Sequence, residues 1–175
     1  MRDKIKCMKE LPKNYAFIDG NNLYLGAKSQ KIKLDYRSLR FYLRDKFGVA
    51  KAFLFIGYDS NNVQLYNSLQ STGFILVFKP TIPYMENGHR QMKGNVDAEL
   101  VLHAAAIEYR NYEKAIIVTS DGDFACLMRY LDEKNKLGRI ITPTASHSSL
   151  LRPFGKYILP LKSIKESVSF RRKTR

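Results

Sequence analysis

Short runs that are apolar at every position alternate with longer amphipathic stretches along most of this chain. A fully apolar run is typical of a strand covered on both faces, and apolar residues spaced three or four apart are typical of a helix. The pattern therefore predicts a three-layer α/β/α sandwich with a central, mostly parallel sheet. The predicted strands cover residues 15–19, 52–56, 74–78, 114–119 and 139–142, with a short sixth strand at 157–159. The predicted helices cover residues 35–47, 61–71, 96–109, 124–135 and 162–169.

The chain has 175 residues and shows no internal repeat or linker-like stretch, which predicts one domain over residues 15–168. Residues 1–14 are predicted to form an N-terminal extension and 169–175 a basic C-terminal tail, which either grips phosphates or is simply solvated. The stretch from Pro80 to Gly94 contains two prolines and two glycines and predicts a loop or flap.

Acidic side chains occur where the predicted strands end. Asp19 closes the first strand, Asp121 and Asp123 follow the fourth, and Asp97 lies in the first turn of the predicted helix 96–109. Because the carboxyl ends of parallel strands meet at one edge of a sheet, we expect these carboxylates to converge there. Converging carboxylates repel one another unless a cation neutralises them, and an oxygen-only ligand set suits Mg²⁺ or Mn²⁺ rather than zinc.

Each acidic segment also has a purely structural interpretation. Asp19 is followed by Gly20 and two asparagines, which is ordinary turn chemistry. Asp97 could simply be an acid that the helix dipole stabilises at a helix start, and Asp123 could simply cap the next helix. The functional interpretation depends on three independent chain segments each presenting an acid.

Thirty lysines and arginines outnumber sixteen aspartates and glutamates, giving a net charge of +14. A balance this basic favours a polyanionic partner such as nucleic acid. Cys7 and Cys126 fit neither a disulfide framework nor a zinc site, so a reduced cytoplasm is predicted, and Cys126 is interpreted as a core thiol. His103, within an apolar helical stretch, is also expected in the core. No stretch is apolar for long enough to be a signal peptide or a membrane span.

Three motifs occur in the order typical of one family: Asp19-x-x-Asn22, Lys93-Gly94-Asn95-Val96-Asp97, and Thr119-Ser120-Asp121-Gly122-Asp123-Phe124. From about Tyr15 to Leu161 the chain resembles a NYN domain, a branch of the PIN-like nuclease superfamily, and is most similar to its bacterial LabA-like members. The resemblance implies a PIN-like α/β/α fold, magnesium at the acidic pocket, and hydrolysis of RNA phosphodiester bonds. It also implies that homodimers are common. Matched by position, Asp19, Asp97 and Asp121 are the metal-binding acids, Asp123 is the second acid of the last motif, and Asn22 is the asparagine of the first.

The chain departs from this family's pattern in two ways. Thr119 and Ser120 stand where the last motif usually has serine and glycine. Many PIN-like nucleases also carry a further acid in mid-chain, for which Asp59 and Glu86 are the candidates, with Asp59 the better placed. This gap keeps open the alternative that the domain binds RNA without cutting it.

Basic residues near the acidic segments are candidates for holding the substrate. Lys79 ends the third predicted strand, and the loop that follows carries Arg90 and Lys93, with Tyr84 nearby. Cations mixed with an aromatic ring suit single-stranded RNA, because phosphates are neutralised while bases stack. A mobile polar loop is the structural alternative.

The sequence thus favours a metal-dependent endoribonuclease in which Asp19, Asp97 and Asp121 hold the ion, Asp123 completes or orders its shell, and Asn22 positions a water or a phosphate. A catalytically silent RNA-binding module is the second hypothesis. A phosphotransferase with Asp19 as nucleophile is weaker, because those enzymes usually have a second aspartate where Asn21 stands. A serine–histidine triad at His147 is rejected, since no nucleophile elbow accompanies it.

Overall fold

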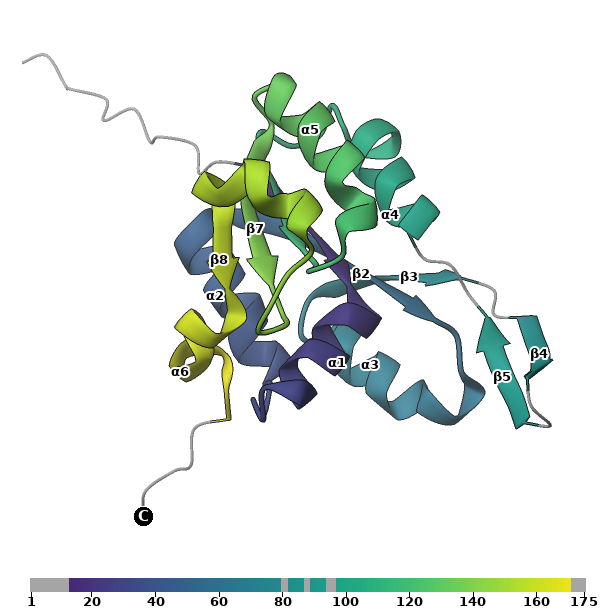
Figure 1. Ribbon diagram of the computed structural model, residues 1–175. Helices are drawn as coiled ribbons and strands as arrows, with labels where there is room; N and C mark the ends of the chain where they lie inside the picture. The colour runs from purple at the N-terminus through teal and green to yellow at the C-terminus, as the bar shows by residue number, and fades with distance from the viewer. Residues whose placement is uncertain (1–12, 80–81, 87–88, 94–96, 171–175) are drawn as a thin grey trace, which may run out of the picture.

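A six-stranded parallel sheet runs through the centre of the domain in the order β3-β2-β1-β6-β7-β8 (Figure 1). The structure is a computed structural model and describes residues 13–79, 82–86, 89–93 and 97–170, with the backbone alone described between 82 and 93. The central strand is β1, and the chain fills one half of the sheet before it crosses to the other. All six strands lie within three residues of their predicted ranges: β1 Asn14–Asp19, β2 Val49–Gly57, β3 Phe74–Lys79, β6 Ala115–Val118, β7 Leu137–Thr142 and β8 Ile158–Pro160.

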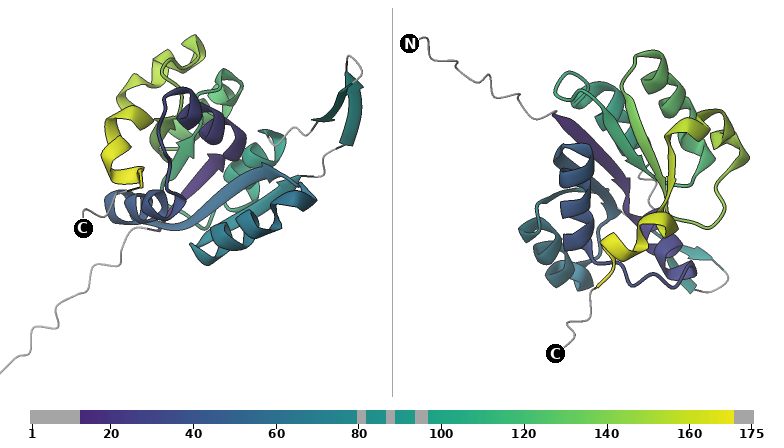
Figure 2. Two further views of the ribbon diagram at one scale, coloured as in Figure 1. Left: turned by 90° about the horizontal axis from the view of Figure 1, so that it is seen from below. Right: turned by 90° about the vertical axis from the view of Figure 1, so that its left-hand side faces the viewer.

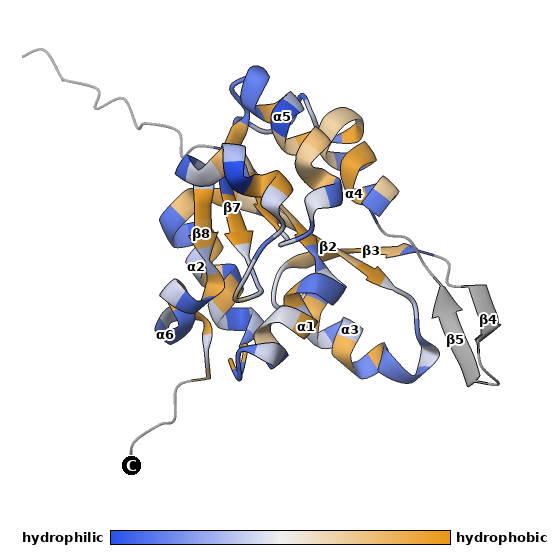
Figure 3. Ribbon diagram, in the orientation of Figure 1, coloured by the Kyte–Doolittle hydropathy of each residue, from blue (hydrophilic) through white to orange (hydrophobic). Residues whose placement is uncertain are grey.

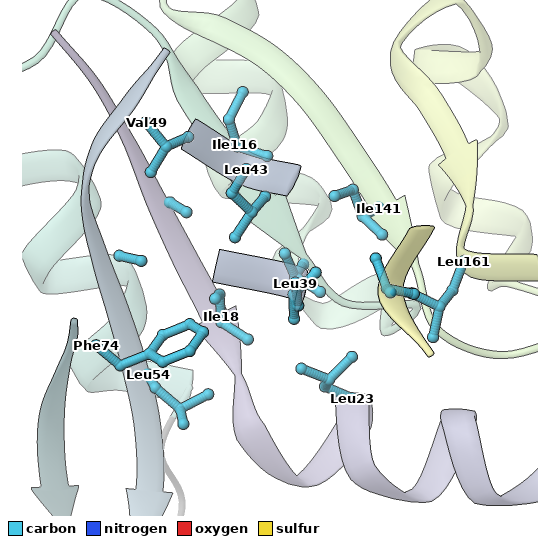
Figure 4. Packing of buried hydrophobic residues seen from close by; sticks show 14 of the residues in the cluster. Ile18, Leu23, Leu39, Leu43, Val49, Leu54, Phe74, Ile116, Ile141 and Leu161 are labelled. Carbon is cyan, nitrogen blue, oxygen red and sulfur yellow. The ribbon is translucent and has the colours of Figure 1, made fainter. Parts of the chain in front are cut away.

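Helices cover both faces of this sheet, which confirms the predicted three-layer α/β/α sandwich (Figures 1 and 2). On one face Ile18 and Leu54 pack against Leu39 and Leu43 of α2 (Figure 4). On the other face Phe17 belongs to a second cluster. The strands of the central sheet are mostly apolar, whereas the helices carry many polar residues (Figure 3). The first face is covered by α1, α2, α3 and α6, and the second by α4, α5 and η4.

The helices begin and end at residues with clear local roles. Asp35 caps α2, since its carboxylate accepts hydrogen bonds from the Arg37 N–H (3.1 Å) and the Ser38 hydroxyl (2.6 Å). Gly48 ends α2 in the left-handed conformation (φ 62°) that glycine adopts without strain. The α-helices are α1 Gly20–Ser29, α2 Tyr36–Phe47, α3 Val63–Ser71, α4 Asp97–Leu102, α5 Ala125–Glu133 and α6 Lys165–Val168. Shorter segments are the 3₁₀ helices η1 Ser60–Asn62, η3 Gly122–Phe124, η4 Ser149–Tyr157 and η5 Leu161–Ile164, and the π-helix η2 His103–Ile107.

Several elements differ from the prediction. The predicted loop between Pro80 and Gly94 is wrong, because its described residues form an antiparallel pair, β4 Ile82–Glu86 and β5 His89–Lys93. The helix α1 was not predicted, because Gly20 and two asparagines indicated a turn. The predicted helix 96–109 is divided: α4 gives way to the π-helix η2, which ends at Ile107. The predicted C-terminal helix is a 3₁₀ turn, η5, followed by the four-residue α6.

The structure also tests two predictions about single residues. Cys126 is exposed rather than a core thiol, because it lies on the outward side of α5. His103 is only partly buried, with its ring against Phe53 and Phe55, so it borders the core cluster rather than lying within it. The proposed limits of the domain stay predictions, since residues 1–12 and 171–175 lie outside the described ranges. In the part of the chain that the structure describes, no helix is long and apolar enough to cross a membrane.

Candidate active site

The carboxyl edge of the sheet carries the candidate site at the point where the strand order reverses, between β1 and β6. In open α/β sheets this switch point leaves a crevice that ligands commonly occupy. Asp19 is the last residue of β1 and the N-cap of α1, and its side chain is buried (6% exposed). Its carboxylate accepts hydrogen bonds from the Asn22 N–H at 3.0 Å and the Thr119 hydroxyl at 3.4 Å. The first acid is thus fixed in position by both neighbouring segments.

The segment after β6 is held against β1 by a second set of hydrogen bonds. The Ser120 N–H donates to the side-chain oxygen of Asn22 at 2.9 Å. The Asp121 N–H donates to the Thr119 hydroxyl at 3.2 Å, and the Asp123 N–H donates to the Asp121 carboxylate at 3.0 Å. Asn22 therefore joins the two acidic segments, which is a structural role beside the ligand-positioning role predicted for it.

Close packing beneath Asp121 requires a glycine. A Cβ atom at Gly122 would overlap the Ser148 hydroxyl and lie 2.9 Å from the Ser148 Cβ and 3.0 Å from Leu150 Cδ1. The Ser148 N–H in turn donates to the Ser120 carbonyl at 3.1 Å. The turn that carries Asp121 and Asp123 is therefore pressed onto the segment leading into η4.

Asp97 brings the third acid from the other side of the crevice. It is the first residue of α4, which packs against β1 and against η3. Burial and the carboxylates of Asp121 and Asp123 raise the pKa of Asp97, while Lys79 acts in the opposite direction. Burial, with smaller contributions from Asp97 and Asp121, likewise raises the pKa of Asp19. These shifts indicate that Asp19, Asp97 and Asp121 lie near enough to repel one another.

The donor set fits a magnesium-type ion. Among the described residues, no group of three or more acidic, histidine or cysteine side chains is placed to hold a metal ion. Mg²⁺ is commonly bound by one or two carboxylates, with water and substrate phosphate oxygens completing its shell, so a group of three is not required. A bound cation would also relieve the repulsion that adds to burial in raising the pKa values of Asp19 and Asp97. The one or two carboxylate ligands would come from Asp19, Asp97, Asp121 and Asp123.

The remaining candidates are only partly placed. Lys79 ends β3 and acts electrostatically on Asp97, so it does lie beside the acids. The side chains of Arg90, Lys93 and Glu86 are outside the described part of the structure. Asp59 is exposed and is occupied locally, accepting hydrogen bonds from the Asn61 N–H (2.9 Å) and the Asn62 side-chain amide (3.0 Å). It therefore caps η1.

The sequence identified Thr119 and Ser120 only as departures from the family's last motif, without a structural role for their hydroxyl groups. The Thr119 hydroxyl bridges Asp19 and Asp121, and the Ser120 hydroxyl accepts a hydrogen bond from the Thr144 N–H at 3.0 Å. Both residues are buried. Two hydroxyl side chains directly before an acid at a strand end were the signal that could have identified this role.

A family model for the NYN domain matches residues 14–159, which include the central sheet and every acid described above. The chain belongs to the NYN domain family. This membership points to a nuclease-like, RNA-related function. The NYN domain also has a structural counterpart in a crystal structure of a protein of unknown function from Vibrio parahaemolyticus, with a TM-score of 0.72 and 19% sequence identity. The match covers 97% of this chain and 100% of the other, and it supports the α/β/α fold. No curated protein matches the sequence.

Proposed function

We propose that this NYN domain is a metal-dependent endoribonuclease of the LabA-like type that acts on single-stranded RNA in the cytoplasm. The observation that carries the proposal is the meeting of Asp19, Asp97 and Asp121, from three separate elements, at the switch point of the sheet. Burial, with repulsion from neighbouring acids, raises the pKa values of Asp19 and Asp97, and this costs folding free energy, so the convergence of the acids calls for a functional explanation.

The chain's own residues have distinct roles in this proposal. Asp19, Asp97 and Asp121 would hold Mg²⁺ or Mn²⁺, and Asp123, exposed at the rim, completes or orders the shell. When bound, such an ion activates water and neutralises charge that develops on phosphate oxygens. Thr119 and Asn22 keep the two strand ends in register. Lys79, next to Asp97, supplies positive charge for an RNA phosphate.

The test is cleavage of an end-labelled single-stranded RNA in Mg²⁺ or Mn²⁺ compared with EDTA, for the wild type and Asp121→Asn. We expect metal-dependent internal cleavage that Asp121→Asn abolishes while RNA binding and the melting temperature are retained. Asp35→Asn is the matched control, since Asp35 also caps a helix but faces Ser38 rather than the acids. Cleavage that persists in Asp121→Asn would rule out this centre.

One observation favours a second candidate, an RNA-binding module that does not cut. The better candidate for a further mid-chain acid, Asp59, is exposed and used to cap η1. This function predicts salt-sensitive RNA binding with no metal-dependent cleavage. We also predict a homodimer, which is compatible with either function. Sedimentation of the purified protein would test it.

A further inference from the structure

Three aromatic rings lie together at the carboxyl ends of β2 and β3, on the side of the sheet that α3 covers. Tyr58 and Phe78 lie 5.6 Å apart between centroids with their planes at 86°, and Tyr66 of α3 lies 4.8 Å from Phe78. Tyr66 is buried, whereas Tyr58 is 47% and Phe78 39% exposed. The two exposed rings thus form a right-angled aromatic corner on the surface, which we call the Tyr58–Phe78 corner.

Hydrogen bonds fix the base of this corner. The Tyr66 hydroxyl donates to the Gly57 carbonyl at 3.3 Å and accepts from the Asp59 N–H at 2.9 Å. The Tyr58 N–H donates to the Lys79 carbonyl at 3.4 Å, so the ends of β2 and β3 are joined at this point. The backbone that carries Tyr58 and Phe78 is therefore fixed, and both rings contact the anchored ring of Tyr66.

Strand register places the corner near the acids. Asp19 is level with Phe55 of β2, which is level with Val77 of β3. The Cα atom of Phe78 is therefore two strands and one residue away from the Cα atom of Asp19, which is about 10 Å at ordinary strand spacings. Lys79 follows Phe78, so its side chain points to the opposite face of the sheet, toward Asp97.

An acidic pocket repels RNA phosphates, so the affinity for RNA must come from groups around it. Lysine beside the pocket can neutralise a phosphate, and an aromatic surface can bind a base with no dependence on charge. The corner has the right shape, because a flat base stacked on one ring meets the other ring edge-on. We propose that the Tyr58–Phe78 corner is a stacking site for one base of single-stranded RNA whose chain continues round the end of β3 to Lys79 and the acids. This inference rests on the proposed function.

The test uses the absence of tryptophan from the chain. Tyr58→Trp places a unique fluorophore in the corner, and all titrations are run in EDTA so that cleavage plays no part. The ligands are a short single-stranded oligouridylate and, as a polyanion without bases, inorganic polyphosphate. Phe41→Trp is the matched control, because Phe41 is 40% exposed on α2 between Arg37 and Arg44, a basic surface without the corner.

We expect RNA to quench Tyr58→Trp strongly, polyphosphate to leave its emission unchanged, and Phe41→Trp to respond weakly to both. Fluorescence anisotropy of labelled RNA should show binding about 10-fold weaker for Tyr58→Ala and for Phe78→Ala, with Tyr58→Phe and Phe41→Ala close to wild type. Circular dichroism would verify that each variant is folded.

RNA that binds by anisotropy without quenching Tyr58→Trp, and with unchanged affinity in Tyr58→Ala, would overturn the stacking site and leave the proposed function standing. Stacking with no metal-dependent cleavage would have the reverse meaning, supporting the site in a domain that binds without cutting. Absence of RNA binding by the wild type would overturn both.

Discussion

The two edges of the central sheet carry charges of opposite sign: the basic residues at the amino edge are mostly paired, whereas the acids at the carboxyl edge lie close to one another. At the amino edge, a cavity of about 540 Å³ is lined by the basic residues Arg44, Lys46, Lys114 and Arg139. Three of these already have partners, since Lys114 donates to the Asn135 carbonyl (2.6 Å), Arg139 donates to the Lys156 carbonyl (3.0 Å), and Arg44 pairs with Asp45 (2.7 Å). At the carboxyl edge, by contrast, burial and neighbouring acids raise the pKa values of Asp19 and Asp97.

The comparison shows that the volume of a cavity is a poorer guide to function than whether the charged side chains around it already have partners. Cations that hydrogen-bond carbonyls at helix ends stabilise the fold, so the basic cavity is explained by structure alone. The buried Asp19 and the part-buried Asp97, with further acids beside them, lower stability and are more simply explained by a ligand. We therefore expect substitutions at the carboxyl edge to affect function and substitutions at the amino edge to affect stability alone.

The largest expected effect separates the two edges by activity. Asp97→Asn should reduce metal-dependent cleavage by at least about 100-fold, because it removes a proposed ligand while keeping the side chain's size. Lys114→Ala, at the amino edge, should leave the cleavage rate near wild type. Single-turnover cleavage of saturating RNA measures both, and equal losses would contradict the assignment of the two edges.

The next effect concerns packing at the carboxyl edge. Gly20→Ala places a Cβ atom 2.8 Å from the Phe55 carbonyl oxygen and against the Ile56 side chain, so we expect unfolding to become easier by about 1–3 kcal/mol. Gly155→Ala is the control, since no atom lies within 4 Å of its added Cβ. Urea denaturation of the two variants would measure the difference, and similar midpoints would refute it.

At the amino edge the expected loss is purely one of stability. Asn14 joins two turns, donating to the Phe47 carbonyl at 2.6 Å and accepting from the Lys114 N–H at 3.0 Å. Asn14→Ala leaves both groups without this partner, and should lower the free energy of unfolding by about 1–2 kcal/mol. Cleavage measured well below the melting temperature should not change. A variant as stable as wild type, or one with lost activity, would count against this view.

The smallest effect runs in the opposite direction. Burial and its acidic neighbours raise the pKa of Asp19 above the ordinary aspartate value, so its ionisation costs folding free energy. That cost is absent below the ordinary pKa of about 3.9, grows as pH rises, and is complete above the raised value. Asp19→Asn can still cap α1, and in EDTA at pH 7 it should raise the melting temperature by about 2–4 °C per kcal/mol relieved.

The gain should shrink as the pH falls toward 4, and differential scanning calorimetry across this range would follow it. Asp35→Asn again supplies the comparison, with no such gain expected at its separate helix cap. A melting temperature that falls in Asp19→Asn at pH 7 would show that the hydrogen bonds of this carboxylate outweigh its repulsion.

The sequence was most informative where burial alone decides structure. The strands were predictable because runs such as Ala52–Ile56 are apolar at every position, which follows from helices on both faces. Local chemistry misled where a tertiary contact decides. Gly20 and the two asparagines after it argued for a turn, yet α1 forms, and Gly20 and Gly26 allow this helix to approach Phe55 and Pro143 closely.

For the site, the acids could be read from strand ends, but their surroundings could not. A pattern places Asp19 and Asp121 at one edge without showing that the Thr119 hydroxyl lies between them. The exposure of Cys126 was missed for a related reason, since an apolar helical pattern does not fix which side of α5 meets the sheet.

The central place of β1 has a consequence for the order in which the protein is made. Its partner β2 follows soon after, but β6 does so only later, with Thr119 and Asp19 standing 100 residues apart in the chain. Because an emerging chain folds from its N-terminal end, the edge of β1 that pairs with β6 stays unpaired until β6 has left the ribosome. The acids can meet only after that event, so the proposed nuclease centre would be absent from a half-made chain while its own messenger is still being translated.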